Sequence, residues 1–130
     1  MYQSSGILNY GPGLRAIVII DQGISDLYRS LIPKYYNVKP QKYRAHITVV
    51  RNEKETPTKL EFWKKYQGQT ISFFYHNDIQ TDGVYFWLNV QSEEIGNIRE
   101  ELGLPRFRDD RKFGGVLRNE YHITIANVKV

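Results

Sequence analysis

Two short runs of the sequence, residues 45–50 and 121–126, constrain the fold more than any other feature. Each run is rich in aliphatic and β-branched residues, and each holds a histidine and a threonine two positions apart. Successive side chains of a strand point to opposite faces, so the histidine and threonine share one face and the aliphatic residues take the other. The runs therefore predict two strands with one buried face each. The two pairs are His46 with Thr48 and His122 with Thr124.

The segments before the two runs repeat one order of elements. The shared order is strand, helix, basic loop and histidine strand, with the first strand and helix at 16–20 and 24–35 in one copy and at 84–90 and 93–103 in the other. This repeat is one of pattern. It predicts a single α+β domain over residues 1–130, with two lobes at about 15–50 and 84–130. We expect an approximate two-fold axis that brings the lobes face to face across a cleft.

Three segments outside the repeat are less regular in pattern. Residues 1–14 contain three glycines and a proline, so we expect an irregular arm, with Tyr10 either reaching over a pocket or packed on the body. Residues 57–66 predict a short helix, because Thr56 and Pro57 form a favourable helix start. Residues 105–119 form a long basic loop, for which a substrate lid, a subunit contact and a solvated loop are all open.

Composition limits the function classes. The chain has 41% hydrophobic and 25% charged residues, which is typical of a globular protein, and it has no cysteine, which excludes disulfides and thiolate–metal sites. No apolar run approaches the ~20 residues of a membrane span, and the N-terminus does not resemble a signal peptide. We expect a cytoplasmic protein without membrane contact. The net charge of +4 favours an anionic partner.

Two histidines presented on facing strands suit general acid–base catalysis. Imidazole titrates near neutral pH, so one ring can accept a proton from water or a ribose 2′-hydroxyl while the other donates a proton to the departing oxygen. Threonine hydroxyls and nearby cations can hold the oxygens of a phosphodiester between them. The pattern predicts phosphodiester cleavage with no metal, no cofactor and no protein partner. It leaves open which histidine is the acid.

Two His-hydrophobic-Thr motifs on a duplicated strand–helix framework resemble the 2H phosphoesterase superfamily. The resemblance implies two mostly antiparallel sheets around a central cleft, with helices packed outside. It also implies metal-independent catalysis by His46 and His122, with Thr48 and Thr124 holding the phosphate. Members include RNA 2′,3′-cyclic phosphodiesterases and 2′–5′ ligase-like proteins, so the motifs imply a reaction type rather than one substrate.

The small size of the chain and its opening, Ser5 to Tyr10, resemble the phage branch of this superfamily. That branch includes nucleases that destroy the cyclic di- and trinucleotides of bacterial CBASS immunity, which implies a cyclic oligonucleotide substrate in the host cytoplasm. Candidate substrate contacts are then Tyr10, Arg44, Trp87 and Arg106, although Trp87 fits the core equally well. An RNA-end enzyme, a protein that sequesters nucleotides without turnover, and a purely structural protein are the alternatives.

Overall fold

The computed structural model describes residues 1–51, 56–107 and 121–129, and within these ranges the protein is α+β, as predicted. Seven strands, two α-helices and two 3₁₀ turns follow one another in these ranges. They are β1 (Tyr2–Tyr10), β2 (Ala16–Ile19), α1 (Gln22–Ser30), η1 (Lys34–Tyr36), β3 (His46–Val50), η2 (Leu60–Phe62), β4 (Thr70–Tyr75), β5 (Gln80–Thr81), β6 (Tyr85–Gln91), α2 (Glu93–Glu101) and β7 (Tyr121–Asn127).

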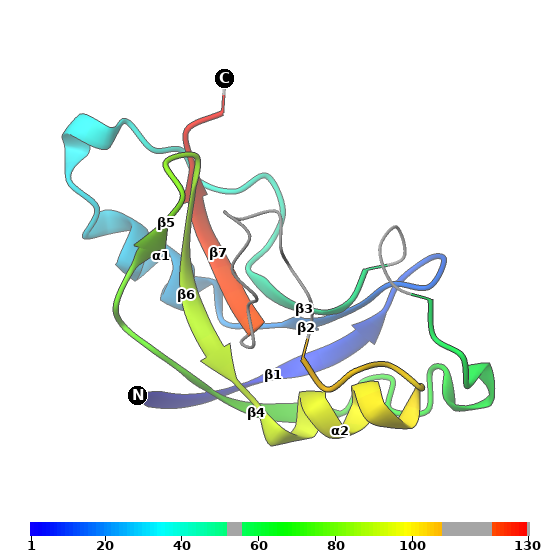
Figure 1. Cartoon of the computed structure of the whole chain (residues 1–130). Coiled ribbons are helices and arrows are strands. Elements are labelled where there is room, and N and C mark those ends of the chain that lie inside the picture. The colour runs from blue at the N-terminus through cyan, green and yellow to red at the C-terminus, as the bar shows by residue number, and fades with distance from the viewer. Residues whose placement is uncertain (52–55, 108–120, 130) are drawn as a thin grey trace.

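The strands form one antiparallel sheet. Its order is β4-β1-β2-β3-β7-β6-β5, and an additional pairing of β4 with β6 closes six of the strands into a barrel. In Figure 1, β6 and β7 run steeply across the direction of β1 and β4. The expectation of two separate sheets facing each other across a cleft is therefore wrong. Strand β3 pairs directly with β7, so the two histidine strands lie side by side within a continuous sheet.

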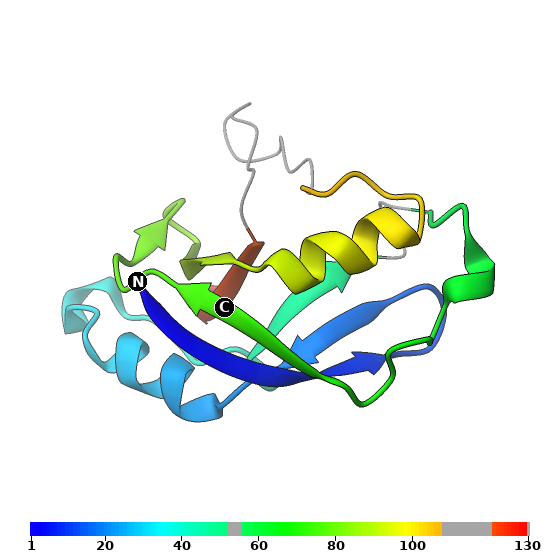
Figure 2. The same cartoon turned by 90° about the horizontal axis from the view of Figure 1, so that it is seen from below.

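In the described residues, the order strand, helix and histidine strand occurs twice, while most of the second basic loop lies outside them. Strands β2 and β3 flank α1 in sequence and pair antiparallel, and β6 and β7 flank α2 and pair in the same way. Each helix packs against the histidine strand of the other half, since α1 lies against β7 and α2 lies against β3 and β4. Figure 2 shows the two helices over different parts of the sheet.

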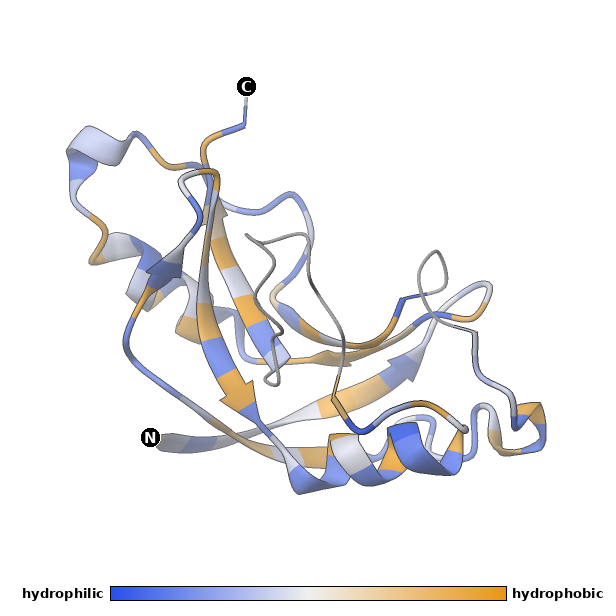
Figure 3. Ribbon diagram, in the orientation of Figure 1, coloured by the Kyte–Doolittle hydropathy of each residue, from blue (hydrophilic) through white to orange (hydrophobic). Residues whose placement is uncertain are grey.

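The alternation along the two histidine strands is also confirmed. Their aliphatic residues are fully buried, whereas the histidines and threonines between them are only half-buried. Figure 3 shows this alternation as hydrophobic and polar bands along β7. The aliphatic face joins the apolar stripes of both helices in one core, which removes the hydrophobic side chains from water. The buried aliphatic residues are Ile47, Val49, Ile123 and Ile125.

The N-terminal segment is a strand and not the irregular arm expected from its glycines. Strand β1 pairs with both β2 and β4. The physical reason lies at Gly6, where β1 approaches β2 so closely that a Cβ atom would lie 2.4 Å from the carbonyl oxygen of Ile19 and 2.7 Å from a methyl carbon of Val18. This glycine provides room for close backbone packing within a sheet and does not mark a turn.

Replacing Gly6 with alanine is expected to lower the free energy of unfolding by about 1–3 kcal/mol, because the added methyl group forces the two strands apart. Urea unfolding at equilibrium measures this change. The matched control is Gly11→Ala, since a Cβ atom there would meet only the Arg15 carbonyl oxygen, at 3.9 Å. Equal stability of the two variants would contradict this explanation of Gly6.

The helix expected over residues 57–66 is reduced to the single turn η2. The backbone N–H groups of Thr58 and Lys59 donate to the carbonyl of Leu102 at 3.0 and 3.1 Å. Trp63 is extended and Lys64 has a φ of 69°, so the helical path ends there. Contacts with the end of α2 therefore outweigh local helix propensity. Most of the basic loop expected over 105–119 lies outside the described residues.

Candidate active site

The pairing of β3 with β7 brings the two motifs together. Ile47 and Ile123 are registered partners. Continuing this antiparallel register by one residue in each direction places His46 opposite Thr124, with Thr48 opposite His122. All four side chains then share the face opposite the core, because both isoleucines belong to the core. The isoleucine pair marks an approximate two-fold axis that exchanges one motif for the other.

This arrangement sets the spacing of the site. Directly opposite residues in an antiparallel pair have Cβ atoms roughly 4.5–5.5 Å apart, and diagonal neighbours lie at roughly 7–8 Å. Each histidine therefore has the threonine of the other motif directly beside it, and the two histidines face each other on the diagonal. The diagonal is short enough for both imidazoles to contact one phosphate group lying above the sheet.

The imidazole of His46 is held in one tautomer. Its Nδ1 lies 2.8 Å from the carbonyl oxygen of Arg44. A carbonyl oxygen only accepts, so Nδ1 carries the hydrogen, and in the neutral ring the lone pair is on Nε2. Burial lowers the pKa of His46, the hydrogen bond to Arg44 opposes that shift, and the positive charge of Arg15 adds to it. His46 is therefore a neutral imidazole near pH 7, with Nε2 as its proton acceptor.

The sheet itself supplies part of this burial. Ile19 of β2 is the registered partner of His46, and Ile17 is the partner of Thr48. Both isoleucines are half-buried on the same face as the motif. Their aliphatic side chains remove water from one side of the imidazole, and a charged ring is disfavoured where water is removed.

The lowered pKa of His46 makes stability depend on pH. Because the folded pKa lies below the unfolded value of about 6.5, the unfolded chain binds the proton more readily. Stability from this residue is complete above about pH 6.5 and is lost as pH falls through the folded pKa. Urea unfolding at pH 7.5 and pH 5 should show a smaller loss in His46→Gln than in the wild type. An equal loss would contradict the burial effect.

Two residues of β6 extend the site on its other side. Trp87 is the registered partner of Thr124, and Asn89 is the partner of His122. The Trp87 indole N–H donates to Asn89 Oδ1 at 3.1 Å, and Trp87 is only 7% exposed. Trp87 therefore lies beside the motif as a largely buried wall. Asn89 was not predicted, although its spacing of two from Trp87 along a strand could have indicated it.

Tyr10 does not have the exposed position expected for a base-stacking residue. It is 7% exposed at the end of β1, and its ring packs edge-on against Trp63 with centroids 4.8 Å apart. Its backbone N–H donates to Gln67 Oε1 at 2.8 Å. Burial raises the pKa of its hydroxyl. Of the two positions expected for Tyr10, the structure shows the one packed on the body, because strand pairing in β1 places the ring in the core.

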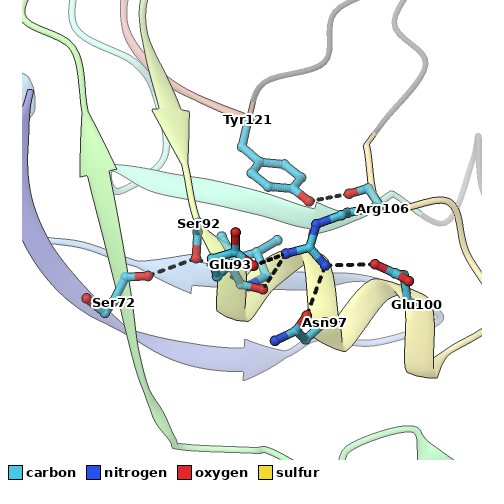
Figure 4. A network of polar contacts seen from close by, with 8 residues as sticks. Ser72, Ser92, Glu93, Asn97, Glu100, Arg106 and Tyr121 are labelled. Carbon is cyan, nitrogen blue, oxygen red and sulfur yellow. Dashed lines mark hydrogen bonds and ion pairs between the residues drawn. The ribbon is translucent and has the colours of Figure 1, made fainter.

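Arg106 is also placed differently from the expectation. Its guanidinium forms ion pairs with Glu93 at 2.5 Å and Glu100 at 2.7 Å and donates to Asn97 at 2.9 Å. Figure 4 shows it held between these three side chains along α2. The Tyr121 hydroxyl donates to its carbonyl oxygen. Two carboxylates already compensate its charge, so Arg106 anchors the chain after α2 and is a poor phosphate ligand.

Arg44 keeps an exposed side chain next to the site. It forms no ion pair with any other residue in the described part of the chain, and its carbonyl oxygen orients His46. The expectation that Arg44 contacts substrate stays a prediction.

Among the described residues, no group of three or more His, Asp or Glu side chains gathers at metal-binding distance. The helices within the described ranges are too short or too polar to cross a bilayer.

Comparisons with protein-family models, with curated proteins and with solved structures found no match to this chain.

Proposed function

We propose that the protein is a metal-independent phosphodiesterase of the 2H type. The observation that supports this is the β3–β7 register, which brings two histidines and two threonines together on one face of the sheet. As substrate we propose cyclic di- and trinucleotides, whose 3′–5′ bonds the enzyme would open to counter bacterial CBASS immunity. The small size of the chain and the resemblance of its opening, Ser5 to Tyr10, to the phage branch favour this substrate class.

In the proposed reaction, His46 is the general base. Its Nε2 accepts a proton from water or a 2′-hydroxyl as the new O–P bond forms. His122, in its protonated form, donates a proton to the departing oxygen as the old P–O bond breaks. The net transfer is one proton from nucleophile to leaving group, with Thr48 and Thr124 donating hydrogen bonds to the non-bridging oxygens. The tautomer and the lowered pKa of His46 support this assignment of roles.

An enzyme acting on RNA ends with a 2′,3′-cyclic phosphate is a second candidate. It would use the same four residues. The observation that favours it is the basic, tyrosine-rich segment at residues 33–45, which ends next to His46 and offers contacts to a linear strand. Only the substrate separates the two candidates.

A product assay tests the proposal. Purified protein is mixed with 3′,3′ and 2′,3′ cyclic dinucleotides, a cyclic trinucleotide and an RNA ending in a 2′,3′-cyclic phosphate, with EDTA present throughout. We expect turnover that is unaffected by EDTA and absent in His46→Ala/His122→Ala. Cleavage of cyclic oligonucleotides alone supports the first candidate, and cleavage of the RNA end alone supports the second. Tight binding without turnover, or a requirement for divalent metal, would overturn the catalytic proposal.

A further inference from the structure

Segment 33–45, between α1 and β3, concentrates the positive charge of the chain. It contains four basic residues and no acidic one, and this charge of +4 equals the net charge of the whole chain. Its tyrosines, Tyr35, Tyr36 and Tyr43, are 80%, 45% and 65% exposed. We call these tyrosines, together with the four cations, the tyrosine strip. The cations are Lys34, Lys39, Lys42 and Arg44.

Two rings of the strip, Tyr35 and Tyr36, pack in series on the buried ring of Phe86, so that the aromatic contacts run from the core to the solvent. Phe86 is buried, and Tyr36 packs against it edge-on with centroids 5.5 Å apart. Tyr35 packs on Tyr36 with centroids 4.7 Å apart and an interplanar angle of 31°. Because Tyr35 is 80% exposed, this series of packed rings ends in an aromatic face that is open to water. A further flat ring would extend the stack there.

The strip is held in place by its backbone. Pro33 precedes η1, and Asn37 ends this turn with a left-handed φ of 55°. Lys39 then exchanges two backbone hydrogen bonds with Asn127 of β7, at 2.7 and 3.0 Å. The backbone that carries Tyr35 and Tyr36 is therefore ordered before a ligand binds, which lowers the entropy cost of binding there.

The cations of the strip are available to an anion. None of the four forms an ion pair within the described part of the chain. Lys42 lies over the Tyr43 ring at 5.7 Å from its centroid, and Lys129 lies over Tyr85 at 4.9 Å. Cations and exposed aromatic rings thus occur together in this segment, which is the combination that binds phosphates and bases of a single strand.

The strip leads away from the candidate active site. At one end, the Arg44 carbonyl accepts from His46. In the middle, Lys39 pairs with Asn127, which lies three residues beyond Thr124, or about 10 Å along the strand. A linear strand with one end at the histidines can follow the segment from Arg44 through Lys39 toward Tyr35.

We propose that the tyrosine strip binds single-stranded nucleic acid, with an unpaired base stacked on Tyr35 and neighbouring phosphates held by Lys39 and Lys42. Exposed π-faces favour a nucleic acid over a lipid surface, because lipid headgroups offer phosphate without a flat ring. A duplex would bind less well, since its bases are already stacked on one another. Strand binding of this kind requires no turnover, so it goes beyond the proposed phosphodiesterase and can be tested separately from it.

Fluorescence anisotropy with a labelled single-stranded DNA of about ten nucleotides tests the proposal. Tyr35→Ala should weaken binding by about tenfold, and Tyr35→Phe should restore it, because stacking requires the ring and not the hydroxyl. Lys39→Ala/Lys42→Ala should reduce the slope of log affinity against log salt by about 1.4, at ~0.7 per lost phosphate contact. The matched controls are Tyr2→Ala, an exposed tyrosine on β1, and Lys59→Ala/Lys64→Ala.

Each outcome has a defined meaning. Failure of the wild type to bind the strand, equal weakening by the controls, or unchanged binding in Tyr35→Ala would overturn the proposal. Equal affinity for a duplex of the same sequence, or binding only to vesicles of anionic lipid, would also overturn it. Strand binding that persists in His46→Ala/His122→Ala supports the strip even if no substrate in the product assay is cleaved. In that case the strip stands and the phosphodiesterase proposal fails.

Discussion

Replacing His46 with alanine is expected to lower phosphodiester turnover by about 10²–10⁴-fold, the usual contribution of a general base. The variant loses the Nε2 acceptor that the hydrogen bond from Nδ1 to Arg44 holds in place. Steady-state hydrolysis of the substrate found in the product assay measures the effect. His76→Ala is the matched control, since the third histidine belongs to neither motif, and it should lose no more than a few-fold. Full activity of His46→Ala would remove this residue from the mechanism.

The pH profile separates the two histidines. A neutral base and a protonated acid give a bell-shaped rate, and a base with a lowered pKa shifts the acidic limb below about pH 6.5. We expect His46→Ala to abolish the acidic limb and His122→Ala to abolish the basic limb. The opposite result would keep both histidines in the mechanism but exchange their roles.

Thr48→Val and Thr124→Val should each lose less activity than the histidine variants, because each removes one neutral hydrogen-bond donor.

The second large effect is expected for Arg99→Ala, which should lower the free energy of unfolding by about 3–5 kcal/mol. Arg99 of α2 is fully buried. Its Nη1 donates to the Val49 carbonyl of β3 at 2.6 Å, and its Nε donates to the Pro105 carbonyl at 2.9 Å. Alanine leaves both carbonyls without these donors and creates a cavity the size of a long side chain. Urea unfolding measures the change.

Two variants sharpen this test. Arg15→Ala removes an exposed arginine next to the same sheet and should change stability by less than about 0.5 kcal/mol. Arg99→Lys should rescue little, because a single ammonium cannot reproduce the planar fork that reaches two carbonyls. Stability of Arg99→Ala close to that of the wild type would show that the buried guanidinium is replaceable by water.

The histidine–threonine face was predictable because its information is local. A period of two in residues 45–50 and 121–126 determines which side chains share a face, whatever the strands pair with. The register between β3 and β7 was not predictable, because it depends on the pairing of segments more than seventy residues apart. The tautomer of His46 was not predictable from the sequence either, since it depends on the direction in which the Arg44 carbonyl points.

Tyr10 and Arg106, both named as candidate substrate contacts, have other contacts in the structure for a common reason. In the sequence, a glycine in a close strand contact looks the same as a glycine in a turn, so residues 1–14 are expected to form an irregular arm, which leaves the position of Tyr10 open. A guanidinium in a basic stretch looks available until its neighbours are known, and Glu93 and Glu100 come from a helix on the other side of the turn. Both cases depend on tertiary partners and not on propensity.

The exchange of helices between the two halves has a consequence for how the molecule can come apart. Because α1 packs on β7 and α2 packs on β3 and β4, separating the two halves would remove from each histidine strand a helix that packs on it. Each half therefore depends on a helix of the other half for its packing. A protease cut between the halves should not release an independently folded fragment. Whatever loosens one motif loosens the other, so the paired site exists only in the intact chain.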